Sequence, residues 1–329
     1  MKKKIAVLTG GYTAEIDISL KSAVNVMNQL DTTKFDTYLI YIDAQKWVYI
    51  DAQKNEYPVN RNDFSITLNN QPIHFDCVVF FPLHGSPTED GKIQGYFDMI
   101  GQKYVGCGVL EASLTFDKAA TKKYLANSNV LMAKSKLYFN TEKIEAIIQH
   151  TQANLSLPLF VKPNKNGSSY GISKVNDWSE LEAAIVKGFE FDNELIIEEF
   201  IAGREMSIGV YQLGGIVYSL HPTEIKSQND FFDYKAKYLG ESSEITPAEI
   251  SDSLTKKLQE INIHVYKELG LKGYARIDYI MKGEEFYLLE ANTTPGFTSE
   301  SLLPQQLRYA QINIQDFFTQ LIEERLLLK

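Results

Sequence analysis

The chain has 329 residues, of which 44% are hydrophobic and 23% charged, a composition typical of a globular protein with about two or three hydrophobic cores. Its formal net charge of -9 argues against sequence-independent binding of nucleic acid, because such binding needs a basic surface. A local basic pocket for a small anion is compatible with this charge.

The N-terminus and the cysteines indicate where the protein works. The first apolar run, IAVL, stops at Gly10 and meets Glu15, which is too early for a signal peptide. No later stretch approaches the roughly 18 uninterrupted apolar residues that a membrane span needs. Cys77 and Cys107 are too few for a disulfide framework or a cysteine metal site. We therefore expect a cytoplasmic protein with no membrane and no nucleic-acid partner.

Strands and helices alternate in the first third of the chain. Apolar runs at 3–10, 35–42 and 75–83 predict strands, and the stretches 17–30 and 91–101 predict helices. This alternation predicts an α/β unit with a mainly parallel sheet. The hexapeptide YIDAQK occurs at 41–46 and again at 49–54, a period too short for a repeat fold, so we predict a local hairpin of matching strands.

The remainder of the chain changes pattern twice. Helices are predicted at 117–130, 141–155, 179–189, 253–270 and 312–327, and strands at 133–139, 158–162, 171–175 and within 194–220. The polar, aromatic segment 225–248 has little periodicity, which is typical of a lid or binding loop.

A predicted hairpin near the C-terminus concentrates polar groups on one face. The runs GYARIDYIM and FYLLEAN flank KGEE, and a turn centred on Glu284 pairs residues whose numbers sum to 568. Asp278 then faces Glu290, and Arg276 faces Asn292. Because side chains alternate along a strand, these four share one side. The other side carries Ala275, Ile277, Tyr279, Leu289 and Ala291.

Two carboxylates opposed in a sheet raise each other's pKa unless a positive charge lies between them. Arg276 supplies part of that charge. Mg²⁺ is a better partner, because it prefers carboxylate and amide oxygens and completes its coordination with water and phosphate. The alternative is a surface salt cluster. We favour the metal, because the acids end apolar strands and Pro295-Gly296 bring bare backbone N–H groups to the same place.

A metal of this kind calls for a nucleotide phosphate. The P-loop pattern is absent, and NKNGSSYG at 164–171 is the better candidate for a flexible phosphate-binding loop. Lys118, Lys162 and Lys237 add positive charge from three separate segments. The alternatives are an ordinary Gly-Ser turn and solvated surface lysines. The strand IIEEF at 196–200 offers backbone groups for an adenine edge, and Glu205 follows for ribose hydroxyls.

Taken in order, the motifs resemble the ATP-grasp superfamily and, within it, the D-alanine–D-alanine ligase family. The resemblance is carried by GGYTAEIDISLKSA, LHGSPTEDGKIQG, YVGCG, FDKAATK, FVKPNKNGSSYGISKV, IIEEFIAGREMSIGV, DYKAKY, EITPA, GYARIDY and LLEANTTPGFTSESLLP. Two positions depart from the family pattern: Pro87-Thr88 replace glycines, and Asn166 replaces a frequent acidic residue.

The resemblance implies an α/β fold of three domains that enclose the nucleotide. They are a Rossmann-like parallel-sheet substrate domain at 1–117, a central α+β domain with the Gly/Ser loop at 118–197, and a C-terminal α+β domain with lid and metal hairpin at 198–329. It also implies that ATP phosphorylates one D-alanine and that the amine of a second D-alanine attacks the acyl phosphate, which makes a peptidoglycan precursor. A homodimer is implied as well.

The family motifs assign residues to this chemistry. The ATP contacts are Lys118, Lys162, Ser169, Glu198, Ile201, Glu205 and Lys237. Mg²⁺, as a pair of ions with Mn²⁺ as an alternative, binds Asp278, Glu290 and Asn292. Glu15 binds the first ammonium group near His84, and Glu15, Ser168 and Tyr238 form a hydrogen-bonded trio. Arg276 and the Gly296 N–H stabilise the oxyanion, and Ser301 and Leu302 bind the second carboxylate.

Other functions and roles stay open at this stage. Without the resemblance, Glu15 is a helix-start acid, His84 a structural histidine and Ser301 a helix cap. A ligase for other amino acids keeps the fold and changes the substrates. A dinucleotide-dependent oxidoreductase is disfavoured because GGYTAE lacks G-x-G-x-x-G, and a nucleotide sensor without turnover because every catalytic motif position is filled. Tyr238 favours D-alanine as the second substrate.

Overall fold

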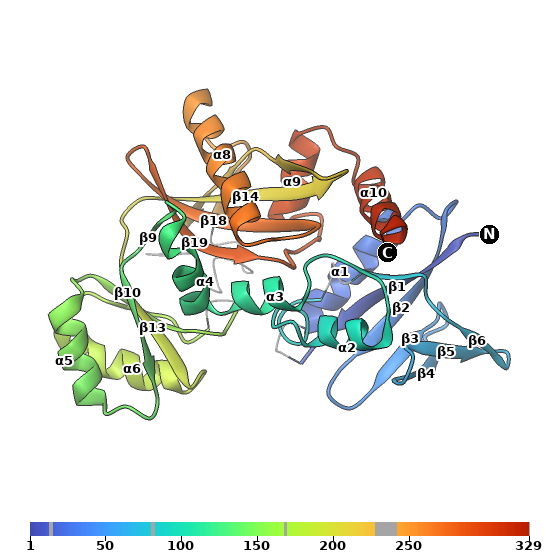
Figure 1. The fold of residues 1–329 in the computed structure, drawn as a ribbon, viewed down its shortest axis with the longest axis horizontal. Coiled ribbons are helices and arrows are strands. Elements are labelled where there is room, and N and C mark those ends of the chain that lie inside the picture. The colour runs from blue at the N-terminus through green and yellow to red at the C-terminus, as the bar shows by residue number, and fades with distance from the viewer. Residues whose placement is uncertain (13–15, 80–82, 168–169, 228–241, 329) are drawn as a thin grey trace.

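The structure is a computed structural model that describes residues 1–12, 16–79, 83–167, 170–227 and 242–328. Within these ranges the strands form three sheets with helices packed around them (Figure 1). The first sheet lies at one end of the molecule, together with both chain termini. The second sheet lies at the other end, and the third sheet lies between and above them in this view.

In the described residues, the first sheet has eight strands in the order β6-β5-β4-β3-β2-β1-β7-β8. They are β1 (Lys3–Gly10), β2 (Phe35–Ile42), β3 (Trp47–Ile50), β4 (Glu56–Asn60), β5 (Ser65–Leu68), β6 (Gln71–Ile73), β7 (Cys77–Val79) and β8 (Tyr104–Val105). Its neighbouring helices are α1 (Ile16–Gln29), α2 (Lys92–Ile100) and α3 (Val109–Phe116).

Only half of this sheet is parallel. Strands β2, β1, β7 and β8 run parallel, and the side chains of β1 from Ile5 to Leu8 are buried, as expected for a parallel strand covered on both faces. Strands β3 to β6 extend the sheet by antiparallel pairing. The prediction of a mainly parallel sheet therefore describes the β2-β1-β7-β8 half alone.

The repeated hexapeptide forms the predicted hairpin. Tyr41 pairs with Val48 across β2 and β3, so the two copies end neighbouring antiparallel strands. Each DAQK segment makes a turn that its aspartate stabilises. Asp43 accepts hydrogen bonds from two backbone N–H groups, at 2.8 and 2.7 Å, and Asp51 does the same at 2.9 and 2.8 Å.

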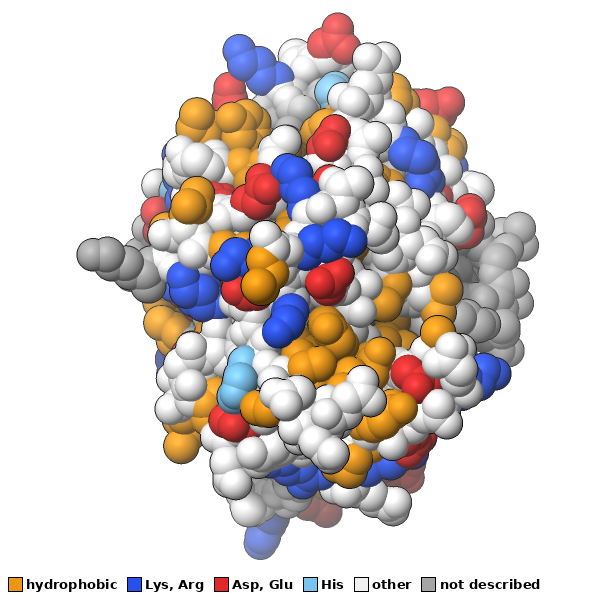
Figure 2. Space-filling view, turned by 90° about the vertical axis from the view of Figure 1, so that its right-hand side faces the viewer, with side chains coloured by type: hydrophobic (Ala, Val, Ile, Leu, Met, Phe, Trp, Pro, Cys, Tyr) orange, Lys and Arg blue, Asp and Glu red, His pale blue; other side chains and the backbone are white. Residues whose placement is uncertain are grey.

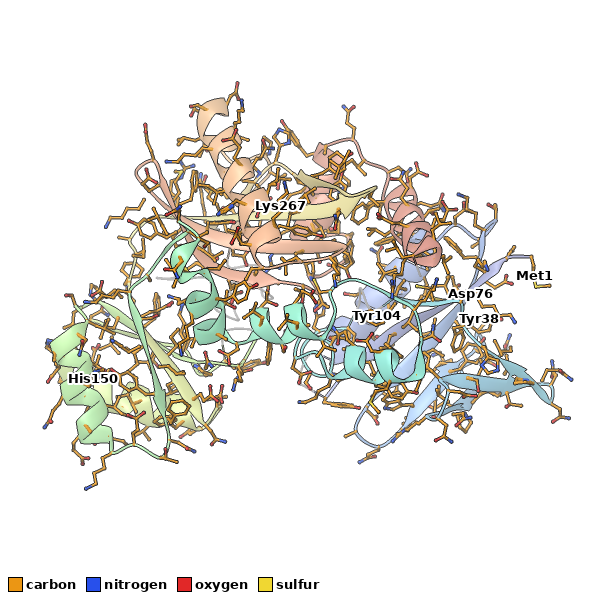
Figure 3. The ribbon with its side chains drawn as sticks, viewed as in Figure 1. Met1, Tyr38, Asp76, Tyr104, His150 and Lys267 are labelled. Carbon is orange, nitrogen blue, oxygen red and sulfur yellow. The ribbon has the colours of Figure 1, made fainter. Side chains whose placement is uncertain are left out.

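The second sheet is antiparallel, in the order β10-β13-β11-β12. Its strands are β10 (Ser135–Phe139), β11 (Leu159–Pro163), β12 (Ser173–Val175) and β13 (Glu194–Glu199), and its helices are α5 (Ile144–Asn154) and α6 (Leu181–Phe189). Figure 3 shows His150 on α5, on the side of this sheet away from the first sheet. Its Nδ1 lies 3.0 Å from the hydroxyl of Tyr138, which joins the helix to the sheet.

The third sheet contains the predicted polar hairpin, which consists of Tyr274–Lys282 and Glu285–Asn292 and is called the ribbon below. Along its main path the strand order is β17-β16-β14-β18-β19-β9, with β15 beside β14. The strands are β9 (Leu131–Met132), β14 (Arg204–Leu213), β15 (Ile216–Ser219), β16 (Thr223–Ser227), β17 (Ser242–Ile245), β18 (Tyr274–Lys282) and β19 (Glu285–Asn292). Near it lie α4 (Lys118–Tyr124), α8 (Asp252–Glu268) and α9 (Leu302–Tyr309).

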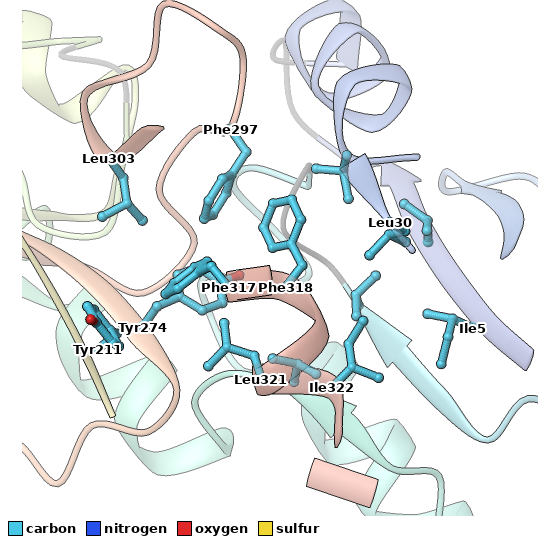
Figure 4. Close-up of a cluster of buried hydrophobic side chains, with 14 of the residues drawn as sticks. Ile5, Leu30, Tyr211, Tyr274, Phe297, Leu303, Phe317, Phe318, Leu321 and Ile322 are labelled. Atoms are coloured by element: carbon cyan, nitrogen blue, oxygen red, sulfur yellow. The ribbon is translucent and has the colours of Figure 1, made fainter. Parts of the chain in front are cut away.

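The last helix, α10 (Ile314–Leu327), joins the first and third sheets through one core (Figure 4). Phe317 and Phe318 of this helix belong to the same buried cluster as Ile5 of β1, Tyr274 of β18 and Phe297. Phe297 is fully buried, so the segment that follows the ribbon has a fixed position against the first sheet.

Two further features of the molecule are the distribution of charge on its surface and the length and hydrophobicity of its helices. On the face drawn in Figure 2, acidic and basic side chains are interspersed, and neither sign dominates that face. None of the helices in the described ranges is both long enough and apolar enough to cross a membrane.

Candidate active site

The ribbon pairs its polar residues as the sequence predicts. Arg276 is opposite Asn292, and Asp278 is opposite Glu290. Nearer the turn the prediction is wrong by one residue, because a bulge follows Asp278 and pairs Tyr279 with Leu288. Leu288, in place of the expected Leu289, therefore enters the core of the third sheet.

Asp278 accepts four hydrogen bonds within the described residues. Arg276 donates to both of its oxygens, at 3.0 and 2.8 Å. Asn292 Nδ2 donates to Oδ2 at 3.1 Å, and Ser207 Oγ on β14 donates to Oδ1 at 2.6 Å. These four bonds use all the lone-pair directions of a carboxylate. Ser207 is fully buried beside Asp278, and the sequence analysis missed it.

The donor set suits a hard divalent cation. Two carboxylates and one amide offer the oxygens that Mg²⁺ prefers, and Arg276 forms an ion pair with one of the carboxylates, Asp278. The ribbon supplies two carboxylates at this place, and the described residues contain no group of three or more His, Cys, Asp or Glu side chains arranged for a metal. A metal at the ribbon therefore needs the amide of Asn292 as a third protein ligand. A cation that binds Asp278 must replace at least one of its present donors.

A pocket lies beside the ribbon, where β19 faces α3, α4 and β9. It is lined by Thr115, Lys118, Thr121, Lys122, Met132, Leu288, Leu289 and Glu290. Glu290 and Lys118, predicted as metal ligand and phosphate contact, thus share one pocket. Its apolar wall consists of Met132, Leu288 and Leu289.

Asn164 connects the pocket to the Gly/Ser loop. It is fully buried at the end of β11, its Oδ1 accepts from Ala119 N at 2.9 Å, and its Nδ2 donates to Asp117 and Glu194, both at 2.9 Å. Asp117 caps α4 through a 2.8 Å bond from Ala120 N. This network holds the start of α4 against the loop, so that Lys118 Nζ donates to Asn166 O at 2.8 Å.

Glu198 lies buried on β13 with two lysines against it. Lys122 Nζ lies 2.6 Å from its Oε2, and Lys162 pairs with its Oε1. Burial by itself raises the pKa of Glu198, but the ammonium groups of Lys162 and Lys122 outweigh it, and the pKa falls to about 2. Lys122 was not predicted. Its position four residues after Lys118, on the same helix face, was the available signal.

The segment after the ribbon meets the first sheet at His84. His84 Nδ1 lies 3.1 Å from Thr294 O, and its backbone N–H donates to Ser19 Oγ at 3.3 Å. Thr294 Oγ1 donates to Glu89 Oε1 at 3.1 Å. Residues of the first unit and of the segment after the ribbon therefore form one polar junction, in which Glu89 and Thr294 were not predicted.

Gly296 and Ser301 lie side by side. A Cβ built on Gly296 would be 2.8 Å from Ser301 Oγ and 3.8 Å from His84 Cε1. Ser301 precedes α9, but its hydroxyl makes no capping bond and instead bonds Thr298 N at 3.0 Å and Thr298 Oγ1 at 2.8 Å. Leu302 is the first, buried residue of α9. The structure thus brings His84, Gly296, Ser301 and Leu302 together.

The other predicted residues fall in two groups. Ile201 follows β13, and Glu205 lies on β14 opposite Ile225 and Ile280. The side chains of Ile201 and Glu205 are half-buried. Glu15, Ser168, Ser169, Lys237 and Tyr238 lie outside the described residues.

The sequence matches two family models that together cover most of the chain. Residues 4–107 match the model described as "D-ala D-ala ligase N-terminus", and residues 126–323 match "D-ala D-ala ligase C-terminus".

Curated relatives and solved structures give the same result. The chain is 46% identical to a D-alanine–D-alanine ligase of Flavobacterium johnsoniae, with 98% of each chain covered. It is 43% identical to one of Parabacteroides distasonis, over 99% of this chain and 98% of the relative. The crystal structure of VanG D-Ala:D-Ser ligase from Enterococcus faecalis superposes with a TM-score of 0.89 at 34% identity, over 99% of this chain and 100% of that one. The chain belongs to the D-alanine–D-alanine ligase family.

Proposed function

We propose that the protein joins two D-alanine molecules to D-alanyl-D-alanine with hydrolysis of ATP to ADP and phosphate, for peptidoglycan precursor synthesis. The observation that carries this proposal is the meeting of the ribbon acids, the lysine-lined pocket and the His84–Gly296–Ser301 junction in a chain of this family. An acyl phosphate of the first D-alanine is the intermediate.

The nucleotide binds between the second and third sheets in this proposal. Lys118 and Lys162 contact its phosphates. Lys118 lines the pocket and donates to Asn166 O of the Gly/Ser loop, and Lys162 shares the carboxylate of Glu198 with Lys122, which also lines the pocket. Glu198 and Ile201 contact adenine, and Glu205 contacts the ribose. Ser169 and Lys237 complete the ATP contacts by family resemblance.

The ribbon holds the cation in this proposal. Asp278, Glu290 and Asn292 bind Mg²⁺, as a pair of ions, through carboxylate and amide oxygens. When bound, Mg²⁺ neutralises charge on the phosphate oxygens. A cation that binds Asp278 must displace one of its hydrogen-bond donors, and Arg276 donates to both of its oxygens. Once Arg276 is released, its guanidinium is available for the oxyanion of the tetrahedral intermediate.

The amino acids bind at the junction. Glu15 holds the ammonium of the first D-alanine beside His84, and the Gly296 N–H donates to the oxyanion. Ser301 and Leu302 bind the carboxylate of the second D-alanine at the start of α9. Glu15, Ser168 and Tyr238 form the hydrogen-bonded trio that closes the site. The residues of this chain then act mainly by positioning, so that the second amine attacks the acyl carbon and phosphate leaves.

D-Serine is the alternative second substrate. The VanG ligase from Enterococcus faecalis, which is 34% identical to this chain, is named a D-Ala:D-Ser ligase. The relatives at 46% and 43% identity are named D-alanine–D-alanine ligases, and Tyr238 favours D-alanine. We therefore place D-alanine first.

The same proposal includes the organisation of the protein. We propose domains at 1–117, with a Rossmann-like parallel core, 118–197 and 198–329. Each range supplies most of one sheet, although β9 pairs with β19 in the third sheet and β13 crosses the boundary at 197. Helix α10 then packs back onto the first domain. We also propose a cytoplasmic homodimer, because ATP is a cytoplasmic substrate and the family resemblance implies a dimer.

A phosphate-release assay tests the function. The purified protein with ATP and Mg²⁺ receives D-alanine, L-alanine, D-serine, or D-alanine with D-serine, and the dipeptide is identified by mass. We expect phosphate release and D-alanyl-D-alanine with D-alanine alone. Equal release with L-alanine would overturn the substrate assignment, and a preferred D-Ala-D-Ser product in the mixture would support the alternative.

A further inference from the structure

Lys122 has no role in the reaction described above, yet it is one of the most enclosed lysines near the pocket. Its side chain is 13% exposed, on α4. Its ammonium donates to Ala133 O at 2.9 Å and lies 2.6 Å from Glu198 Oε2. It therefore connects α4, the segment that enters β10, and the middle of the second sheet.

The two lysines divide the carboxylate of Glu198 between them. Lys162 pairs with Oε1 and Lys122 with Oε2, so each oxygen has its own cation. A buried carboxylate with no cation is strongly destabilised, and removal of one partner of a buried pair leaves an uncompensated charge. The low pKa of Glu198, about 2 despite its burial, agrees with two cations acting together.

The two lysines differ in how they are held. Lys162 is on β11, which leads into the Gly/Ser loop, and its ammonium lies 5.0 Å from the centre of the Phe160 ring. Lys122 has the carbonyl of Ala133 as a second acceptor. An arriving triphosphate therefore draws Lys162 away from Glu198 more readily than Lys122.

We propose that Lys122 is a positioning residue that keeps Glu198 ionised and oriented while Lys162 engages the nucleotide phosphates, and that Lys122 thereby sets the preference for a 6-aminopurine over a 6-oxopurine. This inference rests on the proposed function, in which Glu198 contacts adenine. Movement of Lys162 frees Oε1 of Glu198, and Lys122 continues to neutralise Oε2.

The chemistry of the two bases explains the selectivity. A 6-amino group donates a hydrogen bond, which an ionised carboxylate accepts strongly. A 6-oxo group presents an acceptor oxygen, which repels the same carboxylate. Discrimination between the two bases therefore requires that Glu198 stays charged and in place. A site with a neutral or displaced Glu198 loses the preference for the 6-aminopurine.

Lys122→Gln tests the proposal, with Lys122→Arg as the conservative variant. Lys123→Gln is the matched control, because Lys123 is the exposed next residue of the same helix. Dissociation constants for ATP and for inosine triphosphate are measured by calorimetry with Mg²⁺ and without D-alanine, so ligation is not needed for the result.

We expect Lys122→Gln to weaken ATP binding about tenfold and inosine triphosphate binding less than about threefold, since hydrogen bonds to charged groups are worth that much. Lys122→Arg restores the preference for ATP, and Lys123→Gln leaves both constants unchanged. Equal losses for the two nucleotides would indicate a merely structural role and overturn the proposal.

Glu198→Gln completes a double-mutant cycle and also serves if Lys122→Gln alone does not fold, because the neutral amide removes the buried charge. The preference for ATP falls in Glu198→Gln, and we expect Lys122→Gln to reduce it no further in that background. A further fall of the same size as in the wild-type background would overturn the proposal. A wild-type protein that binds ATP but does not discriminate the two nucleotides would instead overturn the adenine assignment of Glu198, and this inference with it.

Discussion

Substitution of Gly296 by alanine tests how closely the segment after the ribbon is packed against α9. A Cβ at this position would lie 2.8 Å from Ser301 Oγ, which is closer than real Cβ contacts allow, and 3.5 Å from Ser301 Cβ. Gly296 does not have a left-handed backbone conformation, so the conflict is with space alone. The hydroxyl of Ser301 is the atom that must move.

The cost follows from the bonds of that hydroxyl. Movement breaks its 3.0 Å bond from Thr298 N and its 2.8 Å bond with Thr298 Oγ1. Two such bonds contribute about 1–3 kcal/mol to the free energy of unfolding. For a chain of this size, that loss lowers the melting temperature by roughly 1–4 °C. Because Ser301 is proposed to bind the second D-alanine, we also expect Gly296→Ala to raise the KM for the second D-alanine about tenfold.

A double-mutant cycle with Ser301→Ala identifies the cause. Thermal unfolding is measured for the wild type, Gly296→Ala, Ser301→Ala and the double variant. Ser301→Ala loses the same two bonds, but it also removes the obstacle, so Gly296→Ala should cost close to nothing in that background. If the two substitutions are additive instead, the strain arises elsewhere and the reasoning from Ser301 is refuted.

The remaining predictions concern the ribbon and the buried acid. Glu290→Ala should abolish phosphate release, because it removes a carboxylate from the proposed metal set, and near-normal kcat would count against that set. Ser207→Ala removes the 2.6 Å bond to Asp278 and should raise the Mg²⁺ concentration needed for ATP binding about tenfold, measured by calorimetric titration; an unchanged requirement would exclude an orienting role. Glu198 has a pKa lowered to about 2 from 4.5, so its contribution to stability is complete above pH 4.5 and is lost as the pH falls through about 2. Urea unfolding at pH 5 to 3 should therefore show a steeper loss for the wild type than for Glu198→Gln, with a difference of up to about 2 kcal/mol over this range. Parallel pH profiles would contradict the two-lysine account.

The pairing of polar residues across β18 and β19 was the most predictable part of the site. Alternation along two short strands and a tight turn suffice to place Asp278 opposite Glu290, because the period of two leaves one choice of face. The bulge was not predictable. Leu288 and Leu289 are adjacent and identical, so the pattern does not indicate which of them enters the core, and packing in the third sheet selects Leu288.

Parts of the site that depend on distant segments were beyond the pattern. Thr294 and His84 are 210 positions apart, and nothing in either segment alone indicates that they meet. Lys122 was overlooked because a lysine on a predicted helix is usually solvated, and its burial depends on the docking of α4 against Glu198.

The fold, like the site, was predicted only in part. Most helices and the parallel strands β1, β2 and β7 have strong apolar periodicity and were predicted, whereas the short elements α3, α9 and β8 were not. The hairpin of β2 and β3 was predicted, but β4 to β6 were missed. Strands β4 and β6 are short and partly exposed and each contains a proline, Pro58 and Pro72, and β6 lies at the edge of the sheet.

Transfer of oxygen from D-alanine to phosphate tests the central claim most directly. D-Alanine labelled with ¹⁸O in both carboxylate oxygens is incubated with the protein, ATP and Mg²⁺, and the released phosphate is analysed by mass spectrometry. Attack of that carboxylate on ATP, followed by displacement of phosphate by the second amine, predicts one ¹⁸O atom in each phosphate and one retained in the new amide. Phosphate that carries no label would show that ATP is cleaved without an acyl phosphate and would contradict the account.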